Sequence, residues 1–180
     1  IDLYKFKKLY NKSDNYHNYV VAIIIKIISN LSFVHSCKIL HRDIKPTNIC
    51  IKNNIISIID YGFSIKYTYR GKHRENLVQE RIIGTPNFIS ENILLKNTPS
   101  LRDDIESIIY VFIFLLFTKK QYNIYKNLDL YEKKNSIFII NVLKNYIKRD
   151  DFYSYKFKIL NNLINYIKNI DYYEIPEYNY

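Results

Sequence analysis

The sequence predicts a mainly α-helical domain that carries one small β-hairpin. Apolar residues recur at helical spacing through residues 19–36, and an almost wholly apolar segment occupies residues 104–117. Between them, two short runs of β-branched residues flank Asn53 and Asn54, which suit a tight turn because Asn tolerates the left-handed backbone conformation. The chain has 180 residues, 48% of them hydrophobic, which is enough to bury the core of one domain.

Two helices are expected before the hairpin. Residues 1–10 have the spacing of a short amphipathic helix. A polar break follows, in which Ser13 or Asp14 is a candidate N-cap for the long helix at residues 19–36. The broad apolar face of that helix indicates that it lies near the centre of the domain. A short extended piece, residues 38–40, leads out of it.

The segment at residues 63–83 has few periodic signals and is expected to be a loop. Its positive side chains could receive an acidic or already phosphorylated substrate, or they could be a solvated face that reflects composition alone. The sequence leaves these two interpretations open, and His73 is expected to be a surface residue. The basic side chains of the loop are Lys66, Arg70, Lys72, His73, Arg74 and Arg81.

The pattern from Ser100 to Asp103, S-x-x-D, fits a capping box at the start of the apolar helix at residues 104–117. A helix so apolar must be buried, and the adjacent Asp104 could hold backbone N–H groups of another segment. Further along, the sequence predicts an irregular segment and then two helices, at residues 123–135, 137–147 and 157–170.

The stretch from His41 to Asn48 reads H-R-D-I-K-P-T-N, and D-Y-G begins at Asp60. Together with Gly84-Thr85, these motifs resemble in order and spacing the catalytic loop, the metal-binding D-F-G element and the substrate-docking loop of a protein kinase. Phosphoryl transfer requires positioning, metal ions and charge stabilisation from the protein.

The residue types suit that chemistry. Asp43 is the candidate to accept or orient the proton of an attacking hydroxyl, and Lys45 is the nearby cation that offsets charge on the moving phosphoryl group. Asn48 and Asp60 carry the oxygen ligands that Mg²⁺ prefers. In a hairpin centred on residues 53–54, positions 48 and 59 lie opposite each other, so Asn48 and Asp60 should lie side by side with Asp43 just upstream.

Further motifs are closest to the casein kinase 1 superfamily, which includes the vaccinia-related kinases. The stretch from Ser90 to Asn92 is similar to the S-I-N of casein kinase 1, where most kinases have A-P-E. The stretch from Arg102 to Ser107, R-D-D-I-E-S, resembles that family's R-D-D-L-E-S, and Tyr61 in D-Y-G is similar to the vaccinia-related branch.

The resemblance implies a protein-kinase-like C-lobe, with ATP and Mg²⁺ as cofactors and proteins as substrates. In it Asp43 is the catalytic base, Lys45 contacts the transferred phosphate, and Asn48 and Asp60 bind magnesium. It further implies that Thr85, in the substrate loop Gly84-Thr85, holds the catalytic loop. Asp104 would hydrogen-bond the backbone around His41 and Arg42, and those two residues would be structural.

The expected function is therefore that of a serine/threonine protein kinase, since Lys45 and Pro46 favour Ser/Thr over Tyr specificity. The chain also departs from the family, because no Gly precedes Gly62 and only 42 residues precede Asp43. The expectation is that residues 1–180 are an incomplete kinase domain, a C-lobe without the N-lobe and the last helix, and poorly active alone. The alternative is an inactive kinase-like fragment or pseudokinase that acts as an interaction module.

Composition limits the other classes of function. The net charge is +10, but the lysines are spread along the chain without a basic block, so nucleic acid is not the expected partner. The two cysteines, Cys37 and Cys50, provide no disulfide framework and point to an intracellular protein of the cytoplasm or nucleus. The longest apolar run, residues 108–117, is shorter than the roughly 20 residues that span a bilayer, so no membrane is expected.

Overall fold

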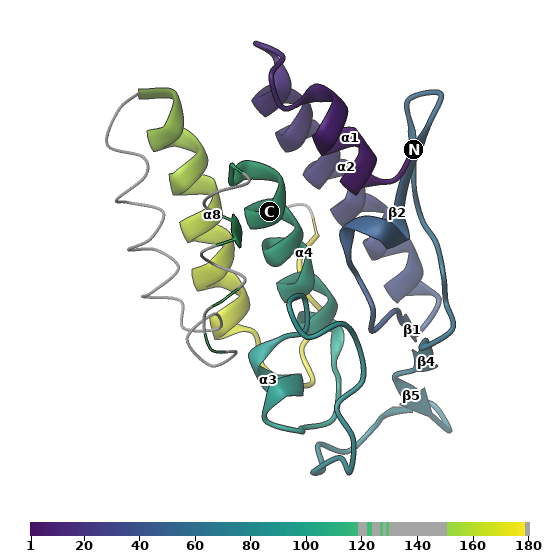
Figure 1. The fold of residues 1–180 in the computed structure, drawn as a ribbon. Coiled ribbons are helices and arrows are strands. Elements are labelled where there is room, and N and C mark those ends of the chain that lie inside the picture. The colour runs from purple at the N-terminus through teal and green to yellow at the C-terminus, as the bar shows by residue number, and fades with distance from the viewer. Residues whose placement is uncertain (119–121, 124–126, 128, 130–150, 179–180) are drawn as a thin grey trace.

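The computed structural model describes residues 1–118, 122–123, 127, 129 and 151–178. Two long helices, α2 (Tyr16–Ser36) and α4 (Leu101–Leu116), pack against each other in the middle of the molecule. In Figure 1, α8 (Asp151–Asn169) lies against α4 on one side, and the short strands lie on the other side, beyond α2. The described part of the chain also contains the short helices α1 (Leu3–Tyr10) and α3 (Glu91–Leu94).

The two amino-terminal helices form where the sequence predicts them, with one difference at a helix start. Helix α1 is capped by Asp2, whose Oδ1 accepts a hydrogen bond from the Lys5 N–H at 2.8 Å. Helix α2 begins three residues before the predicted position, and Asn15 is its N-cap residue. The expectation that Ser13 or Asp14 caps this helix is therefore wrong.

Helix α2 is long and apolar enough to cross a membrane by length and composition, and it is the one such helix in the described part of the chain. In the structure it packs against α4 and the strand at Ile55–Ile58. The side chains of Val20, Ile27 and Leu31 are fully buried in that contact. A core helix of a folded domain has this arrangement.

Within the residues that the structure describes, the strands form three separate antiparallel pairs. The pairs are β1 (Ile39–Leu40) with β4 (Ile65–Lys66), β2 (Ile49–Lys52) with β3 (Ile55–Ile58), and β5 (Thr68–Tyr69) with β6 (Lys72–His73). A turn of 3₁₀ helix, Pro46–Asn48, leads directly into β2.

The β2–β3 hairpin has the turn that its sequence predicts. Asn53 and Asn54 both have positive φ angles, of 49° and 63°, as a two-residue turn matched to the strand twist requires. Ile49 pairs with Ile58, so residues 48 and 59 lie opposite each other, and the Ile59 N–H donates to the Asn48 carbonyl at 2.9 Å. The hairpin therefore delivers Asp60 to the open end beside Asn48.

Residues 63–83 contain more structure than the sequence indicates. Three short strands lie in this segment, and the β5–β6 turn uses positive φ angles of 49° at Arg70 and 78° at Gly71. Two-residue strands are too short to leave a periodic pattern in the sequence. His73, which is expected at the surface, is partly exposed, and its ring packs against Tyr67, Tyr172 and Tyr173.

The buried helix α4 begins at Leu101, three residues before the predicted start. The reason is the capping box: the Ser100 N–H donates to Asp103 Oδ2 at 2.6 Å, which places Ser100 at the N-cap and Asp103 inside the first turn. Helix α8 also begins earlier than predicted, at Asp151. The segments predicted at residues 123–135 and 137–147 lie largely outside the described residues.

Candidate active site

Asp43 is the centre of a group of polar side chains at the end of the β2–β3 hairpin. Its side chain is buried, with the residue only 3% exposed. The carboxylate Oδ1 accepts a hydrogen bond from Thr85 Oγ1 at 2.7 Å, and Oδ2 accepts from Lys45 Nζ at 2.6 Å and from Asn48 Nδ2 at 3.1 Å. The structure therefore brings four of the predicted site residues into direct contact, and the buried carboxylate has the partners that it needs.

Asn48 and Asp60 present oxygen atoms at the same end of the hairpin. The Asn48 amide nitrogen donates to the Asp43 main-chain carbonyl at 3.0 Å as well as to its carboxylate, so Oδ1 is the amide atom that can bind a cation. Asp60 is exposed and has a φ angle of 66°, and its Oδ1 accepts from the Gly62 N–H at 3.3 Å. The hydrogen bond between Ile59 and Asn48 ties the two residues together through the backbone.

These two residues fit a magnesium ion that is bound together with a nucleotide. Mg²⁺ takes one or two carboxylate or amide oxygens from a protein and completes its shell with phosphate oxygens and water. Asn48 Oδ1 and the exposed Asp60 carboxylate are donors of that kind. In the parts of the chain that the structure describes, no group of three or more His, Cys, Asp and Glu side chains gathers as a cage for a metal.

The side chains of His41 and Asp104 hold the backbone around Asp43 in place by hydrogen bonds. His41 Nε2 donates to the Ile59 carbonyl at 3.0 Å, so its Nδ1 can accept from the Asp43 N–H at 3.3 Å. The Asp104 carboxylate accepts from the N–H groups of His41 at 2.7 Å and Arg42 at 2.8 Å. Arg42 has a φ angle of 65°, which is unfavourable for a residue with a side chain, and these hydrogen bonds hold it there.

Gly84 lets the segment that contains Thr85 approach the catalytic loop closely. Its φ angle is 113°, a region that residues with a Cβ rarely adopt. A Cβ at this position would lie 2.8 Å from the Arg42 carbonyl oxygen and 2.7 Å from Ile89 Cγ2. The absence of a side chain therefore allows Thr85 to reach the Asp43 carboxylate.

This geometry places a lysine beside a buried carboxylate, with two oxygen donors of the kind that bind Mg²⁺ on the adjoining hairpin. Residues 2–170 match the family model of the protein kinase domain. The chain belongs to the protein kinase family. As a kinase, the protein is a transferase whose substrates are proteins, and the family typically uses ATP and Mg²⁺.

Another buried carboxylate of the kinase chain, Asp103, organises the segment after Thr85. Asp103 accepts hydrogen bonds from Ser90 Oγ at 2.7 Å, Asn92 Nδ2 at 3.1 Å and the Ser100 N–H at 2.6 Å. Burial raises the pKa of Asp103 to about 6, even though the hydrogen bonds from Ser90 and Ser100 oppose that shift. The S-E-N stretch is therefore tied to the start of α4 through this carboxylate.

Two contributors to the site were not singled out from the sequence, His35 and Tyr178. His35 Nε2 lies 3.0 Å from Asp104 Oδ2, and the Tyr178 hydroxyl is hydrogen-bonded to His35 Nδ1. A signal for His35 was present, because it continues the buried row Ile27 and Leu31 at a spacing of four, and a buried imidazole needs partners. Tyr178 leaves no comparable signal, since it lies 143 residues from His35.

Proposed function

We propose that this chain is the catalytic lobe of a serine/threonine protein kinase, which transfers the γ-phosphate of ATP to hydroxyl groups of protein substrates. The observation that carries the proposal is the convergence of Lys45, Asn48 and Thr85 on the carboxylate of Asp43. No G-x-G-x-x-G motif occurs in these 180 residues, so the proposal assigns to them the catalytic lobe only.

Each residue has a role in the proposed reaction. The substrate hydroxyl oxygen forms a bond to the γ-phosphorus as the bond to the ADP oxygen breaks, and the hydroxyl proton passes to the Asp43 carboxylate. Lys45, which touches both Asp43 and Thr85, offsets negative charge on the phosphoryl group. Asn48 and Asp60 would hold Mg²⁺, which neutralises charge on the phosphates when it is bound.

The proposal extends to the casein kinase 1 superfamily. Ser90 and Asn92 bind the Asp103 carboxylate, so the S-E-N stretch has a defined structural role in place of the Glu of A-P-E. We also propose that substrates are acidic or already phosphorylated. In support, a hollow of about 570 Å³ beside β5 and β6 is lined by several of the basic residues of the loop, Arg70, Lys72, His73 and Arg74.

The test is a phosphotransfer assay with the full-length gene product, ATP, Mg²⁺ and peptides that carry Ser, Thr or Tyr next to acidic residues. Asp43→Asn should lower kcat by a factor of about 10² or more, since it removes a general base. The control is Asp14→Asn, which changes an exposed carboxylate between α1 and α2 and should keep full activity.

Three results would count against the proposal. Equal turnover by the wild type and Asp43→Asn removes Asp43 from its role. Transfer to Tyr alone overturns the Ser/Thr assignment. If the wild type transfers no phosphate at all, the alternative, a kinase-like interaction module, replaces the enzyme.

A further inference from the structure

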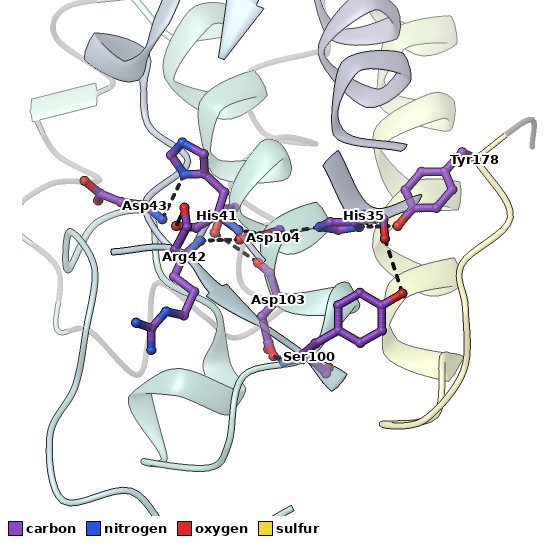
Figure 2. Close-up of polar contacts among 11 residues, drawn as sticks. His35, His41, Arg42, Asp43, Ser100, Asp103, Asp104 and Tyr178 are labelled. Atoms are coloured by element: carbon purple, nitrogen blue, oxygen red, sulfur yellow. Dashed lines mark hydrogen bonds and ion pairs between the residues drawn. The ribbon is translucent and has the colours of Figure 1, made fainter. Parts of the chain in front are cut away.

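A carboxy-terminal segment, residues 170–178, is bound to the core of the molecule near the catalytic loop. Its first carbonyl, that of Ile170, accepts a hydrogen bond from Arg102 Nη1 at 2.9 Å, and the Glu177 N–H donates to the Tyr166 hydroxyl at 2.6 Å. These anchors bring the ring of Tyr178 edge-on to the ring of His35. Figure 2 shows the Tyr178 hydroxyl pointing at the imidazole.

The hydrogen bonds around His35 determine which ring nitrogen carries the proton. Burial alone would raise the pKa of Asp104, but the hydrogen bond from His35, the positive charge of that ring when it is protonated, and the hydrogen bonds from the His41 and Arg42 N–H groups outweigh burial and hold the pKa below its usual value. An ionised carboxylate only accepts hydrogen bonds, so the Nε2 atom of His35 must donate to it. In a neutral ring Nδ1 is then the acceptor.

The Tyr178 hydroxyl is suited to donate to that acceptor. Burial is the main cause that raises the pKa of Tyr178, so the phenol keeps its proton throughout the physiological range. The hydrogen bonds are then all donated in one direction, from the Tyr178 hydroxyl to His35 Nδ1 and from His35 Nε2 to the Asp104 carboxylate. His35 and Asp104 are 3% and 2% exposed, so bulk water does not compete for these bonds.

This series of hydrogen bonds continues from Asp104 to the backbone next to the catalytic aspartate, Asp43. The carboxylate holds the N–H groups of His41 and Arg42 at 2.7 and 2.8 Å, and Arg42 has the strained φ angle of 65°. Asp43 is the next residue, and its own N–H faces His41 Nδ1. A rotation of the Asp104 carboxylate would release the backbone that orients Asp43.

We propose that Tyr178 is a positioning residue for phosphoryl transfer, whose hydroxyl fixes the tautomer of His35 and so orients the Asp104 carboxylate beneath the catalytic loop. This inference rests on the proposed kinase function. Tyr178 acts through His35, because its hydroxyl is bound to that ring rather than to any residue of the Asp43 group.

The test compares Tyr178→Phe with Tyr173→Phe in the full-length protein. Tyr173 lies in the same segment, is 57% exposed and supplies a matched loss of one phenolic oxygen. Tyr178→Phe should lower kcat about 10-fold, the scale of a small misplacement of a catalytic group, and should change the KM for ATP less than about 2-fold. Tyr173→Phe should leave both values unchanged.

A second readout does not depend on activity. In ¹⁵N NMR spectra, the wild-type His35 ring should carry a proton on Nε2 and none on Nδ1, and Tyr178→Phe should populate the other protonation states. A kcat unchanged in folded Tyr178→Phe, an equal loss in Tyr173→Phe, or a proton on wild-type Nδ1 overturns the inference. If Tyr178→Phe does not fold, the protonation state of His35 in the wild-type spectrum tests the inference by itself. An inactive wild type with the predicted spectrum refutes the kinase proposal and keeps the hydrogen-bond chain.

Discussion

Replacing Gly84 with Ala tests how closely the loop before Thr85 approaches the catalytic loop. At a φ angle of 113° any residue with a Cβ is strained, at a cost of about 1–3 kcal/mol. The new Cβ would also lie 2.8 Å from the Arg42 carbonyl oxygen and 2.7 Å from Ile89 Cγ2, and such overpacking costs about 1–3 kcal/mol more. The lower entropy of the unfolded Ala chain returns about 0.4–1 kcal/mol. We therefore expect a net loss of about 1–5 kcal/mol, which is the sum of the two costs less the returned entropy.

Gly71→Ala provides the matched control. Gly71 also has a positive φ angle, of 78°, but no heavy atom lies within 4 Å of a Cβ built there. Its cost should be limited to backbone strain, about 1–2 kcal/mol, less the same return of about 0.4–1 kcal/mol from the unfolded chain. The assay is urea unfolding of both variants, followed by phosphotransfer at a temperature at which both are folded. Gly84→Ala should also lose turnover, because the displaced carbonyl belongs to the residue before Asp43. Equal costs and equal turnover in the two variants would refute this account of Gly84.

Three further predictions concern stability and pH. Burial lowers the pKa of Lys7 from 10.5 to about 8, so the folded state loses this proton at a lower pH than the unfolded state. The stability of the wild type, measured by urea unfolding, should therefore rise by about 2–3 kcal/mol relative to Lys7→Met between pH 8 and 10.5. A stability difference that stays constant with pH contradicts this. The pKa of Asp103 is raised to about 6, so the folded state binds the proton more tightly, and the wild type should lose about 2 kcal/mol relative to Asp103→Asn between pH 4 and 6. A wild type that becomes more stable relative to Asp103→Asn as the pH rises would contradict this prediction. Asn54→Gly should raise Tm only slightly, because the strain of about 1 kcal/mol that it relieves at a φ angle of 63° is largely offset by about 0.4–1 kcal/mol of added unfolded-chain entropy. A clearly lower Tm would show that the Asn side chain contributes more than the strain.

The sequence predicted those parts of the site that depend on local spacing. Asp43, Lys45 and Asn48 lie within six residues, and the Asn53-Asn54 turn determines where Asp60 emerges, so a pattern of neighbours was sufficient. The capping box at Ser100 and Asp103 was predicted and is confirmed, but α2 and α4 each begin three residues before the predicted position, because an apolar period does not determine helix ends to the residue.

The contacts that depend on distant segments could not be predicted in the same way. Gly84 was identified as part of a substrate-docking loop, but its contact with Arg42 joins segments 42 residues apart. The hydrogen bond between His35 and Tyr178 spans 143 residues, and a lone His and a lone Tyr carry no mark of their pairing. Only the packing of α2, α4 and the carboxy-terminal segment brings them together.

The most direct test of the central claim is a crystal structure of the full-length protein with Mn²⁺, used in place of Mg²⁺, and a non-hydrolysable ATP analogue. Anomalous scattering locates the metal without assumptions about the protein. The account predicts Mn²⁺ bound to Asn48 Oδ1 and the Asp60 carboxylate at a little over 2 Å, with the γ-phosphate beside Lys45 and facing Asp43. A metal and nucleotide that bind elsewhere, and touch neither Asn48 nor Asp60, would contradict it.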